Sequence, residues 1–571
     1  MKKVGLFLGD WWRLVIPYFK SEEWPYAIPL LVGAIALTFT GVGFEVLFNE
    51  WNRRFYDAIQ NKNEPVFWQE AIFFSWLAML YIVNAVARAI VSPYLRLRWR
   101  RWLTRHYMAH WLDGRGYYRI ELQRSIDNVD QRIAEDLNYL GQYTMQLFLG
   151  FLTAVGTLLS FIFILWTLSG PLSLSFIGLD VVIPGYMAIA AVIYAVVGSF
   201  FANLVGRRLI PLNFMQQRYE ANFRFSLVRV RENAEAIALY NGERREAEVL
   251  NTRFADVFAN GWRVLFTQVQ LAFYQTGYAQ IAIIFPLLVA APRYFSGAIT
   301  LGILMQIASA FGQVQGGLSF FVDNYTGLAE LRAVMDRLKG AQAAIDAKPP
   351  AAIVVEPEAG QDVGLRDLTL ALPTGQALLK DTNLTLPHGT SILVRGASGS
   401  GKSTLFRALA GIWPFGSGKV RVPAGARVLF LPQKPYIPIG TLRDAVRYPD
   451  EHSKASDADL VDALQAAGLG QLTGRLDEVA HWSNMLSGGE QQRLAVARAI
   501  VFKPDWLFMD EATASLDEDA EAMVYGALKK RLPDTTIVSI GHRPTLKQWH
   551  DRQLELKRAP GQVGTLVEAP A

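Results

Sequence analysis

Residues 396–403 form a glycine-rich octapeptide, Gly396-Ala397-Ser398-Gly399-Ser400-Gly401-Lys402-Ser403. An apolar run, Ser391 to Val394, precedes it and predicts a buried strand, while Thr404 to Ala410 predicts a helix. Strand, glycine loop and helix are the context in which the pattern G-x-x-x-x-G-K-[ST] binds phosphate. Backbone N–H groups of such a loop point into one concavity, and the helix N-terminus adds its positive end. The pattern therefore predicts a nucleoside triphosphate site.

The chemistry expected at this site divides among four side chains. Lys402 can reach the β- and γ-phosphates, and Ser403 can hold Mg²⁺. Downstream, an apolar strand ends in Asp510 and Glu511. We expect Asp510 to orient Mg²⁺ through water and Glu511 to polarise the attacking water. Two solvated acids at a strand end are the alternative, but the upstream phosphate loop favours ATP and Mg²⁺ as cofactors.

The composition indicates a membrane protein of several domains. The chain has 571 residues, of which 51% are hydrophobic, and it carries a net charge of +5. Its arginines cluster beside apolar segments, which favours a lipid bilayer over nucleic acid as the partner. The absence of cysteine excludes disulfides, zinc–thiolate sites and cysteine nucleophiles. Asp10 and Arg13 interrupt the first apolar stretch, so we expect an interfacial N-terminal helix rather than a secretory signal.

Six apolar segments in the first 325 residues are long enough to cross a bilayer as helices, because about 20 residues span its hydrocarbon core. They lie near residues 25–48, 67–91, 146–168, 181–203, 270–291 and 300–322. Buried helices of a large soluble protein are the alternative for any one segment, but six in succession argue against it. Several polar side chains on these segments are candidates for lining a wet cavity: Glu45, Asn49, Gln275, Gln280, Gln306 and Gln313.

Arginine in the loops predicts the orientation of these spans. Nine arginines lie between residues 96 and 132, and ten lie between residues 207 and 263. The opposite loops contain none from Ser169 to Asp180 and only Arg293 from 292 to 299. We therefore expect a multi-pass protein of the bacterial inner membrane, with both termini and the nucleotide site in the cytoplasm.

Changes in composition predict the domain boundaries. Residues 1–339 should form the helical membrane domain with its six spans, and residues 340–362, which contain Lys348-Pro349-Pro350, should form a linker. Short strands and turns follow, so residues 363–557 should form an α/β phosphate-loop domain. The last residues, 558–571, have little to pack and should be loose.

The second domain contains a further glycine loop, Leu486-Ser487-Gly488-Gly489-Glu490, at the start of a predicted helix. This loop resembles the signature motif of the ATP-binding cassette proteins. In the expected order, Gln433 resembles the Q-loop, Ser515-Leu516-Asp517 the D-loop and His542 the switch histidine. The resemblance implies that Gln433 helps to hold ATP and Mg²⁺, and that His542 assists Glu511 in catalysis. It also implies that the signature and Asp517 act on the ATP held by a partner subunit. The position that stacks an aromatic ring on adenine in many cassettes falls near Leu372, so no such contact is assigned.

The membrane half of the chain resembles a narrower group of transporters within this family. Segments 99–104, 127–136, 223–227 and 235–243 are similar to those of the SbmA/BacA-like transporters and their peroxisomal acyl-CoA relatives of the D subfamily. This resemblance implies an exporter-like helical fold and a coupling segment that touches the cassette. The residues expected to couple are Asp130, Gln131, Arg132, Glu135 and Asp136. A solvated, charged loop helix is the alternative for this segment.

Six spans and one cassette make half a transporter, so we expect a homodimer with two composite ATP sites. The family resemblance favours ATP-driven uptake of peptides or other bulky hydrophilic solutes. An exporter or flippase of lipid or fatty-acyl substrates is the alternative. A membrane receptor that only senses ATP is disfavoured by Glu511 and His542. A DNA-repair-type cassette ATPase is disfavoured by the six spans, and we expect no nucleic-acid partner.

Overall fold

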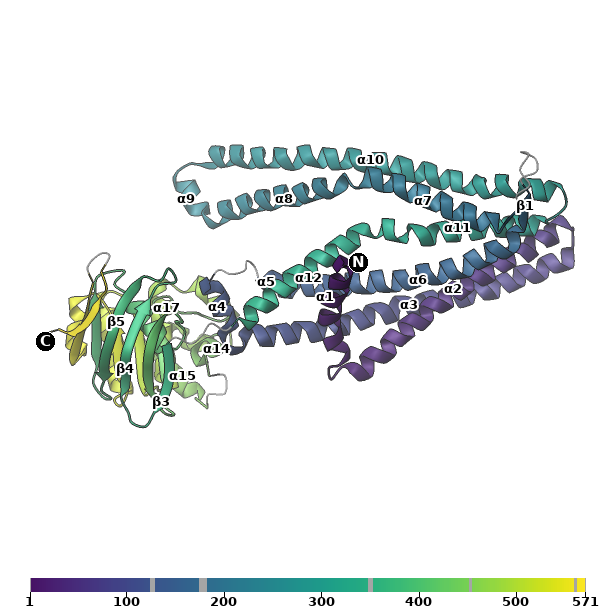
Figure 1. The fold of residues 1–571 in the computed structure, drawn as a ribbon. Coiled ribbons are helices and arrows are strands. Elements are labelled where there is room, and N and C mark those ends of the chain that lie inside the picture. Colours follow the sequence, from purple (N-terminus) through teal and green to yellow (C-terminus); the bar gives the residue numbers. More distant parts are fainter. Residues whose placement is uncertain are drawn as a thin grey trace. The chain divides into compact units, whose positions relative to one another are not determined.

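The computed structural model describes residues 2–123, 129–173, 182–347, 353–450, 454–558 and 562–569. The chain forms two units, Met1–Ala347 and Lys348–Ala571. The first unit is built from long helices, and the second from two larger β-sheets and a two-stranded one, with helices beside them (Figure 1). This architecture confirms the predicted fold class, in which an exporter-like helical domain precedes an α/β phosphate-loop domain.

The helical unit contains these elements in chain order: α1 Lys2–Phe19, α2 Trp24–Gln60, α3 Glu64–Leu112, η1 Asp113–Arg115, α4 Gly116–Gln123, α5 Val129–Gln131, the π-helix η2 Arg132–Asp136, α6 Leu137–Ser169, β1 Pro171–Ser173, β2 Val182–Pro184, α7 Tyr186–Gly206, α8 Leu209–Glu232, α9 Ala234–Leu239, α10 Glu243–Phe295, α11 Leu301–Asp323 and α12 Tyr325–Asp346. The strands β1 and β2 pair as an antiparallel hairpin between α6 and α7, which the sequence did not predict. The longest helices, α3 and α10, extend well beyond the predicted spans.

Five helical segments in the described part of the chain are long and apolar enough to cross a membrane. They are Trp24–Gln60, Glu64–Gln123, Val129–Ser169, Tyr186–Glu232 and Glu243–Phe295. They contain four of the six predicted spans in full. The fourth predicted span, 181–203, is helical only from Tyr186, because Val182–Pro184 form β2, and residue 181 lies outside the described residues. The sixth predicted span forms α11, which is not in this set because Gln306, Gln313 and Gln315 lower its hydropathy. Nevertheless, α11 packs against α2, α6 and α7 inside the unit.

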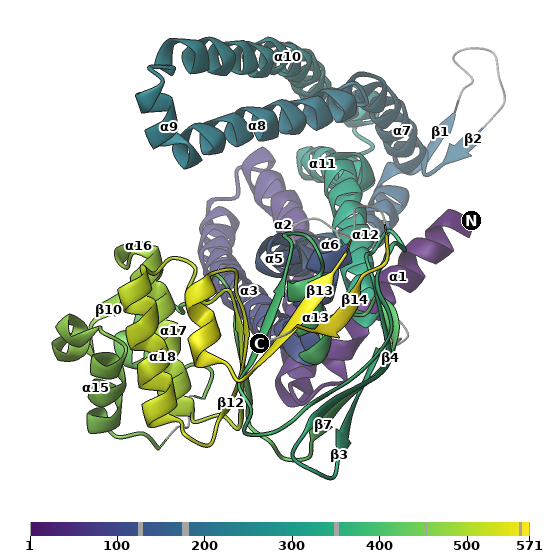
Figure 2. The same cartoon turned by 90° about the vertical axis from the view of Figure 1, so that its left-hand side faces the viewer.

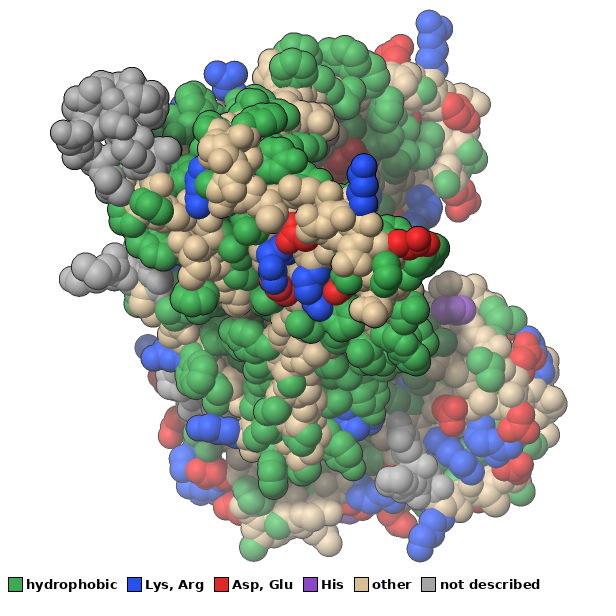
Figure 3. Space-filling view, turned by 90° about the vertical axis from the view of Figure 1, so that its right-hand side faces the viewer, with side chains coloured by type: hydrophobic (Ala, Val, Ile, Leu, Met, Phe, Trp, Pro, Cys, Tyr) green, Lys and Arg blue, Asp and Glu red, His purple; other side chains and the backbone are tan. Residues whose placement is uncertain are grey.

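The N-terminal helix α1 is held to the other helices by its side chains. The ring of Tyr18 is fully buried and stacks on the ring of Trp99 in α3, with centroids 5.8 Å apart. On the same helix, Asp10 forms a salt bridge to Lys339 of α12, at 2.8 Å. Apolar side chains cover much of the unit's surface (Figure 3), as expected where helices face hydrocarbon rather than water.

The second unit has these elements: β3 Ile353–Glu358, β4 Val363–Ala371, β5 Ala377–Leu386, β6 Ile392–Gly396, α13 Lys402–Leu409, β7 Gly416–Pro423, β8 Val428–Leu431, β9 Gly440–Thr441, α14 Leu442–Arg447, α15 Asp457–Ala466, η4 Gly470–Arg475, β10 Val479–Ala480, α16 Trp482–Met485, α17 Gly488–Phe502, β11 Trp506–Asp510, α18 Glu518–Arg531, β12 Thr536–Ile540, η5 Pro544–Trp549, β13 Arg552–Lys557 and β14 Thr565–Glu568. The larger sheet has the strand order β14-β13-β6-β12-β11-β8, and a second sheet has the order β3-β7-β4-β5.

The central strands of the larger sheet run parallel and are buried on both faces. All five residues of β12, Thr-Ile-Val-Ser-Ile, are buried, as are the first four of β11. Such continuous apolar runs are typical of a parallel sheet covered on both sides. Because parallel strands end at the same edge, the loops after β6, β11 and β12 meet there.

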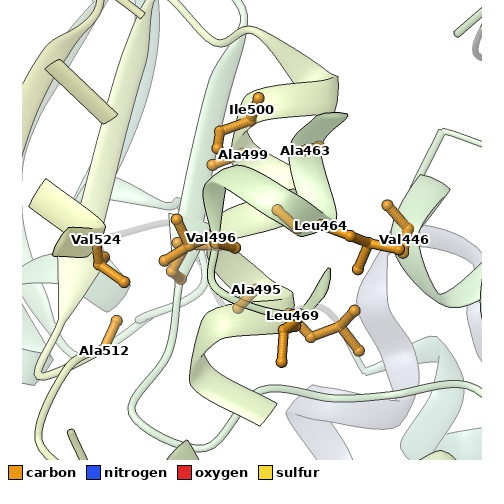
Figure 4. Packing of buried hydrophobic residues seen from close by; sticks show 14 of the residues in the cluster. Val446, Ala463, Leu464, Leu469, Ala495, Val496, Ala499, Ile500, Ala512 and Val524 are labelled. Atoms are coloured by element: carbon orange, nitrogen blue, oxygen red, sulfur yellow. The ribbon is translucent and has the colours of Figure 1, made fainter. Parts of the chain in front are cut away.

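Helices α14, α15, α17 and α18 share one apolar core in this unit. Leu464 of α15 and Val496 of α17 are fully buried and pack beside Val446 of α14 (Figure 4). Figure 2 shows these helices gathered on one side of the unit, with β3, β4 and β7 on the other. The core places α17, and with it the signature loop at its start, on a rigid support.

Two predicted boundaries need correction. Most of the predicted linker, residues 340–362, is ordered, because α12 continues to Asp346 and β3 pairs with β7. The predicted loose tail also contains a strand, because β14 pairs antiparallel with β13 and adds an edge to the larger sheet. The pairing of β3 with β7 and of β14 with β13 holds these segments in place, although the segments themselves contain few apolar residues. Residues 348–352, 559–561, 570 and 571 lie outside the described residues.

A buried histidine makes the stability of the second unit depend on pH. His550 Nδ1 donates to Leu546 O (2.8 Å), and Nε2 accepts from Ser539 Oγ (2.8 Å). Burial lowers the pKa of His550 from 6.5 to about 4, helped by the positive charge of Lys529. The unfolded chain binds a proton below pH 6.5 that the folded chain binds only near pH 4. The free energy of unfolding therefore falls as the pH falls through this window, by about 3 kcal/mol in total.

We predict that His550→Gln removes most of this pH dependence, because glutamine does not titrate. The measurement is the urea midpoint of the second unit in the full chain between pH 7 and pH 4, read by limited proteolysis. His481→Gln is the matched control because His481 is exposed. An unchanged pH slope in His550→Gln would contradict the assignment.

Candidate functional site

The phosphate loop connects β6 to α13, and two of its glycines are required by the backbone. Gly401, immediately before α13, has φ 112°, a conformation that other residues rarely adopt. At Gly396, an added Cβ would lie 2.6 Å from the carbonyl oxygen of Leu556, because β13 passes directly beside it. The loop can therefore lie close to the sheet and turn its N–H groups toward an anion. Ser398, Gly399 and Ser400 complete this loop, as the sequence predicted.

Lys402 is the first residue of α13, and only 5% of its surface is exposed. Its Nζ donates to the carbonyl oxygens of Gly396 (2.8 Å) and Ala397 (3.0 Å). Burial lowers the pKa of Lys402, while the carboxylates of Glu511 and Asp510 act in the opposite direction. The ammonium thus lies over its own loop, close to the two acids at the end of β11.

The residues predicted to hold Mg²⁺ are brought together at the sheet edge. Ser403 Oγ donates to Asp510 Oδ1 at 3.0 Å. Burial raises the pKa of Asp510, partly offset by this hydrogen bond. A hydroxyl and one carboxylate suit Mg²⁺, which keeps several water ligands and also binds substrate phosphates. No cluster of three or more His, Asp or Glu side chains that could hold a resident metal occurs in the described ranges.

Glu511 lies between Gln433, which is predicted to help hold ATP and Mg²⁺, and His542, which is predicted to assist Glu511 in catalysis. Its Oε2 accepts from Gln433 Nε2 (3.0 Å), and its Oε1 accepts from His542 Nε2 (2.9 Å). The backbone of Glu511 has φ 50°, in the left-handed region that side chains rarely adopt. Such strain is typical of functional positions held by their surroundings. The structure thus brings Gln433, Glu511 and His542 into one hydrogen-bonded set.

The signature loop is shaped by a capping box at the start of α17. Ser487 Oγ accepts from Glu490 N (3.3 Å), and Glu490 Oε2 accepts from Ser487 N (2.9 Å). The N-terminus of the helix, with Gly488 and Gly489, therefore stays open toward solvent, while Leu486 is buried beneath it. Asp517 likewise caps α18, accepting from Ala520 N at 2.7 Å. These residues present an anion-binding helix end rather than completing a site with their own phosphate loop.

Gln492 links three motifs, and the sequence analysis assigned it no role. It is 2% exposed; its Nε2 donates to Gln433 O (3.1 Å), and its Oε1 accepts from Ser515 N (2.9 Å). The signature helix, the Q-loop and the D-loop are therefore mechanically connected. Its position two residues after Glu490 was a possible signal, but a buried amide cannot be distinguished from an exposed one by spacing alone.

The predicted coupling residues do not all face outward. Asp136 is 3% exposed and accepts two hydrogen bonds from Arg337 of α12, at 2.6 and 2.8 Å. Arg132 also approaches Asp136, at 3.5 Å. Asp136 and Arg132 thus join α12 to η2 inside the helical unit, and the coupling role of this segment stays a prediction. Asp130, Gln131 and Glu135 are exposed, while Asp127 and Asn128 lie outside the described residues.

The structure defines both the turn that contains Leu372 and a cation that lies beside the phosphate loop. Leu372 lies in the β4–β5 turn, where its N–H donates to Gln376 O (2.8 Å). Arg558 lies beside the phosphate loop, and its Nη1 donates to Gly399 O (3.2 Å). The sequence analysis placed Arg558 in a loose tail. Its position becomes evident only when β13 is aligned with β6.

A parallel sheet with a phosphate loop, a hydroxyl–carboxylate pair suited to Mg²⁺ and a neighbouring acid defines a P-loop ATPase, here joined to a helical membrane unit. Comparison with known families agrees with this class. The family model "ABC transporter transmembrane region 2" matches residues 12–295, and the model "ABC transporter" matches residues 379–514.

Relatives extend this match to nearly the whole chain. An uncharacterised ABC transporter ATP-binding protein of Haemophilus influenzae is 39% identical over 553 residues, covering 96% of this chain and 92% of the relative. ABC transporter D family member 2, a chloroplastic protein of Arabidopsis thaliana, is 32% identical and covers 96% of this chain and 86% of the relative. The chain therefore belongs to the ATP-binding cassette transporters, as a half-transporter related to the D subfamily.

A solved structure supports the fold alone. A bacterial Atm1-family ABC exporter with ATP bound superimposes with a TM-score of 0.75 and 18% identity, over 95% of each chain. The prediction of an ABC transporter ATPase is confirmed, whereas placement in the SbmA/BacA-like branch stays a prediction.

We predict that Glu511→Gln retains ATP binding but lowers ATP turnover by roughly 10²-fold or more, because glutamine keeps the shape but cannot accept the proton of the attacking water. The measurement is phosphate release by the purified full chain, with nucleotide binding assayed in parallel. Glu518→Gln is the matched control, since Glu518 begins α18 away from the hydrogen-bonded set. Turnover at the wild-type rate in Glu511→Gln would contradict the assignment of the base.

Proposed function

We propose that the chain works as a homodimer that couples ATP hydrolysis to the uptake of bulky polar solutes, such as peptides, across the bacterial inner membrane. Membership of the family establishes that the chain is an ATP-driven ABC transporter. The homodimer, the direction, the cytoplasmic location of the termini, the cargo and the SbmA/BacA-like placement are the proposal.

An incomplete surface on the helical unit supports the homodimer. Helices α8, α9 and the first half of α10 form a hairpin that stands apart from α2, α3 and α6 (Figure 1). Neither α8 nor α9 contains a buried residue, and Tyr240, directly after α9, is 86% exposed. Several arginines lie near Tyr240 in the sequence, so the hairpin belongs in water rather than in hydrocarbon. A second copy of the chain would cover this surface and supply the second signature loop.

The geometry of the site supports a division of labour between two subunits. Within one chain, Lys402, Asp510 and Glu511 converge on the phosphate loop, whereas Ser487 and Asp517 use their side chains to cap helix starts. The open end of α17 is suited to the γ-phosphate held by another subunit. ATP would then bind more tightly to the closed pair than to the open one, and this difference would shift the membrane helices. Water activation by Glu511, oriented by Gln433 and His542, would reset the pair. Mg²⁺, held by Ser403 and Asp510, would neutralise phosphate charge.

A polar recess among the membrane helices supports a polar cargo. A cavity of about 590 Å³ lies between α2, α3 and α6, with Glu45 and Gln146 in its wall. Gln313 lines an adjoining cavity of about 400 Å³, and Gln275 a separate one of about 240 Å³. Of the other wet-cavity candidates, Asn49 donates to Gln306 O in the α2–α11 packing and is structural. The relationship to the D subfamily and the exporter-like fold favour the alternative, export of lipid or fatty-acyl substrates.

The composite site can be tested by complementation. We predict that Lys402→Ala and Ser487→Arg each abolish ATP turnover, because one loses the phosphate contact and the other blocks the signature loop. A dimer of one subunit of each kind has one intact composite site, so mixing the two should restore turnover. Each variant mixed with itself is the control. A mixture no more active than either parent would argue against sites shared between subunits.

The direction of transport can be tested in a bacterium that lacks its own peptide importers. Expression of the chain should sensitise this strain to toxic peptides that act in the cytoplasm, because uptake raises their internal concentration. Growth inhibition is the measurement, and expression of Glu511→Gln is the control, since its cycle should stall. Resistance that increases with expression would indicate export and favour the lipid or fatty-acyl alternative.

A further inference from the structure

Four polar residues form a stripe along one side of α3. Asn84, Arg88, Ser92 and Arg96 follow one another at intervals of four residues, so their side chains leave the helix on the same face. All four line the cavity of about 590 Å³ between α2, α3 and α6. This polar face is unusual for a helix whose length and composition suit a membrane span.

The remaining walls of the cavity contain polar side chains among apolar ones such as Val42 and Leu149, and the cavity continues beyond its first compartment. Gln142, Gln146 and Thr153 of α6 lie in its wall, and Glu45 faces it from α2. The adjoining cavity of about 400 Å³, toward α11, shares Glu45, Arg88 and Gln146 with the first. The two compartments therefore form one recess, which we call the α3 recess. Its wall contains two guanidinium groups and one carboxylate.

Several polar groups of this stripe have no hydrogen-bond partner among the residues that the structure describes. Asn84 is only 7% exposed, and neither its Oδ1 nor the buried Ser92 Oγ forms a hydrogen bond within that part of the chain. Neither Arg88 nor Arg96 forms a hydrogen bond or salt bridge with any described residue. Glu45 accepts from Thr157 Oγ1 (3.3 Å) and interacts with the charge of Arg88 only at longer range.

Other arginines of the same unit show how unusual this is. Arg98, two residues after Arg96, forms a salt bridge with Glu23 at 2.7 Å. Arg54 pairs with Glu70 at 3.2 Å, and Arg337 with Asp136 at 2.6 Å. Arg88 lies inside the predicted span 67–91, and Arg96 lies just beyond its end. An unpaired cation in a membrane segment is expensive and marks a ligand pathway. The α3 recess therefore contains binding capacity for anions that the protein itself does not use.

We propose that Arg88 and Arg96 bind an anionic oxoacid group, a carboxylate or a phosphate, of the transported solute in the α3 recess. A guanidinium presents paired N–H donors that match the two oxygens of such a group. The two Cα atoms are about 12 Å apart along the helix. Their long side chains can converge on one group near Ser92 or hold two groups of an extended solute. Asn84 Oδ1 adds an acceptor for a donor group of the same solute. This inference rests on the proposed transport function.

The sequence contains no cysteine, which allows a direct test of the charge in the recess. A single thiol is introduced with Ser92→Cys in the full chain, embedded in lipid nanodiscs. Its reaction rates with two methanethiosulfonate reagents of similar size, one a sulfonate and one a quaternary ammonium, are compared. We expect the sulfonate to react faster, by about tenfold relative to the same pair on a free thiol, because the local potential concentrates anions.

Charge variants should change the ratio of the two reaction rates in opposite, predictable directions. On the Ser92→Cys background, Arg88→Gln and Arg96→Gln should each reduce the preference for the sulfonate, whereas Glu45→Gln should increase it. A merely structural role would not move the ratio in opposite directions. Arg105→Gln is the matched control, since Arg105 lies on α3 outside the recess and is exposed. The inference would be overturned if both reagents reacted at equal rates or if neither reacted. It would also be overturned if the ratio did not change in Arg88→Gln and Arg96→Gln.

Protection of the introduced thiol identifies the source of the anion. A peptide with a free C-terminal carboxylate should slow the reaction more than the same peptide with a C-terminal amide if the anion belongs to a soluble solute. Phosphatidylglycerol in place of phosphatidylcholine should slow it if the anion is a lipid headgroup. If neither the peptide nor phosphatidylglycerol slows the reaction, the inference that the recess binds an anionic group is wrong. The thiol assay requires no ATP turnover, so its failure is distinguishable from failure of the proposed transport cycle.

Discussion

The parallel alignment of β6, β12 and β11 determines where the chemistry of this protein takes place. Ile540 at the end of β12 pairs with Val394 of β6 on one side and with Asp510 of β11 on the other. Because parallel strands end at one edge, the phosphate loop, the pair Asp510-Glu511 and His542 emerge side by side. The sheet can adopt this alignment because its central strands are apolar enough to be covered on both faces.

This alignment also creates strain and burial at the site. Glu511 is held at φ 50° between hydrogen bonds from Gln433 and His542. Lys402 and Asp510 are buried close together, so burial shifts their pKa values in opposite directions, each toward the neutral form. Bound phosphate and Mg²⁺ would favour the charged forms of Lys402 and Asp510 that burial disfavours. Gln492 extends the same network to the signature helix, so a movement of the Q-loop is felt at the D-loop.

The helical unit obeys a different constraint, because hydrocarbon offers no partner for a free backbone N–H or C=O. Uninterrupted helices such as α2 and α3 satisfy this constraint, and their apolar side chains form the outer surface. Polar groups inside the unit are mostly paired, as Asp136 with Arg337 shows. The α3 recess departs from this rule. Its unpaired guanidinium groups do not stabilise the fold, which indicates that they serve another purpose.

The sequence by itself determined the phosphate loop, the two acids at the end of β11, the signature loop, the long apolar helices and the order of the two domains, because each depends on residue types at short, fixed spacing. It also indicated that Glu45 and Gln313 could line a cavity. It did not reveal the strands β3 and β14, the role of Gln492, the position of Arg558 or the burial of Asp136. Each of these depends on a partner far along the chain: β14 on β13, Gln492 on Gln433, Arg558 on Gly399 and Asp136 on Arg337. Local patterns specify which element forms, whereas only the tertiary structure decides which elements meet, because long-range pairing leaves no periodic trace in the sequence.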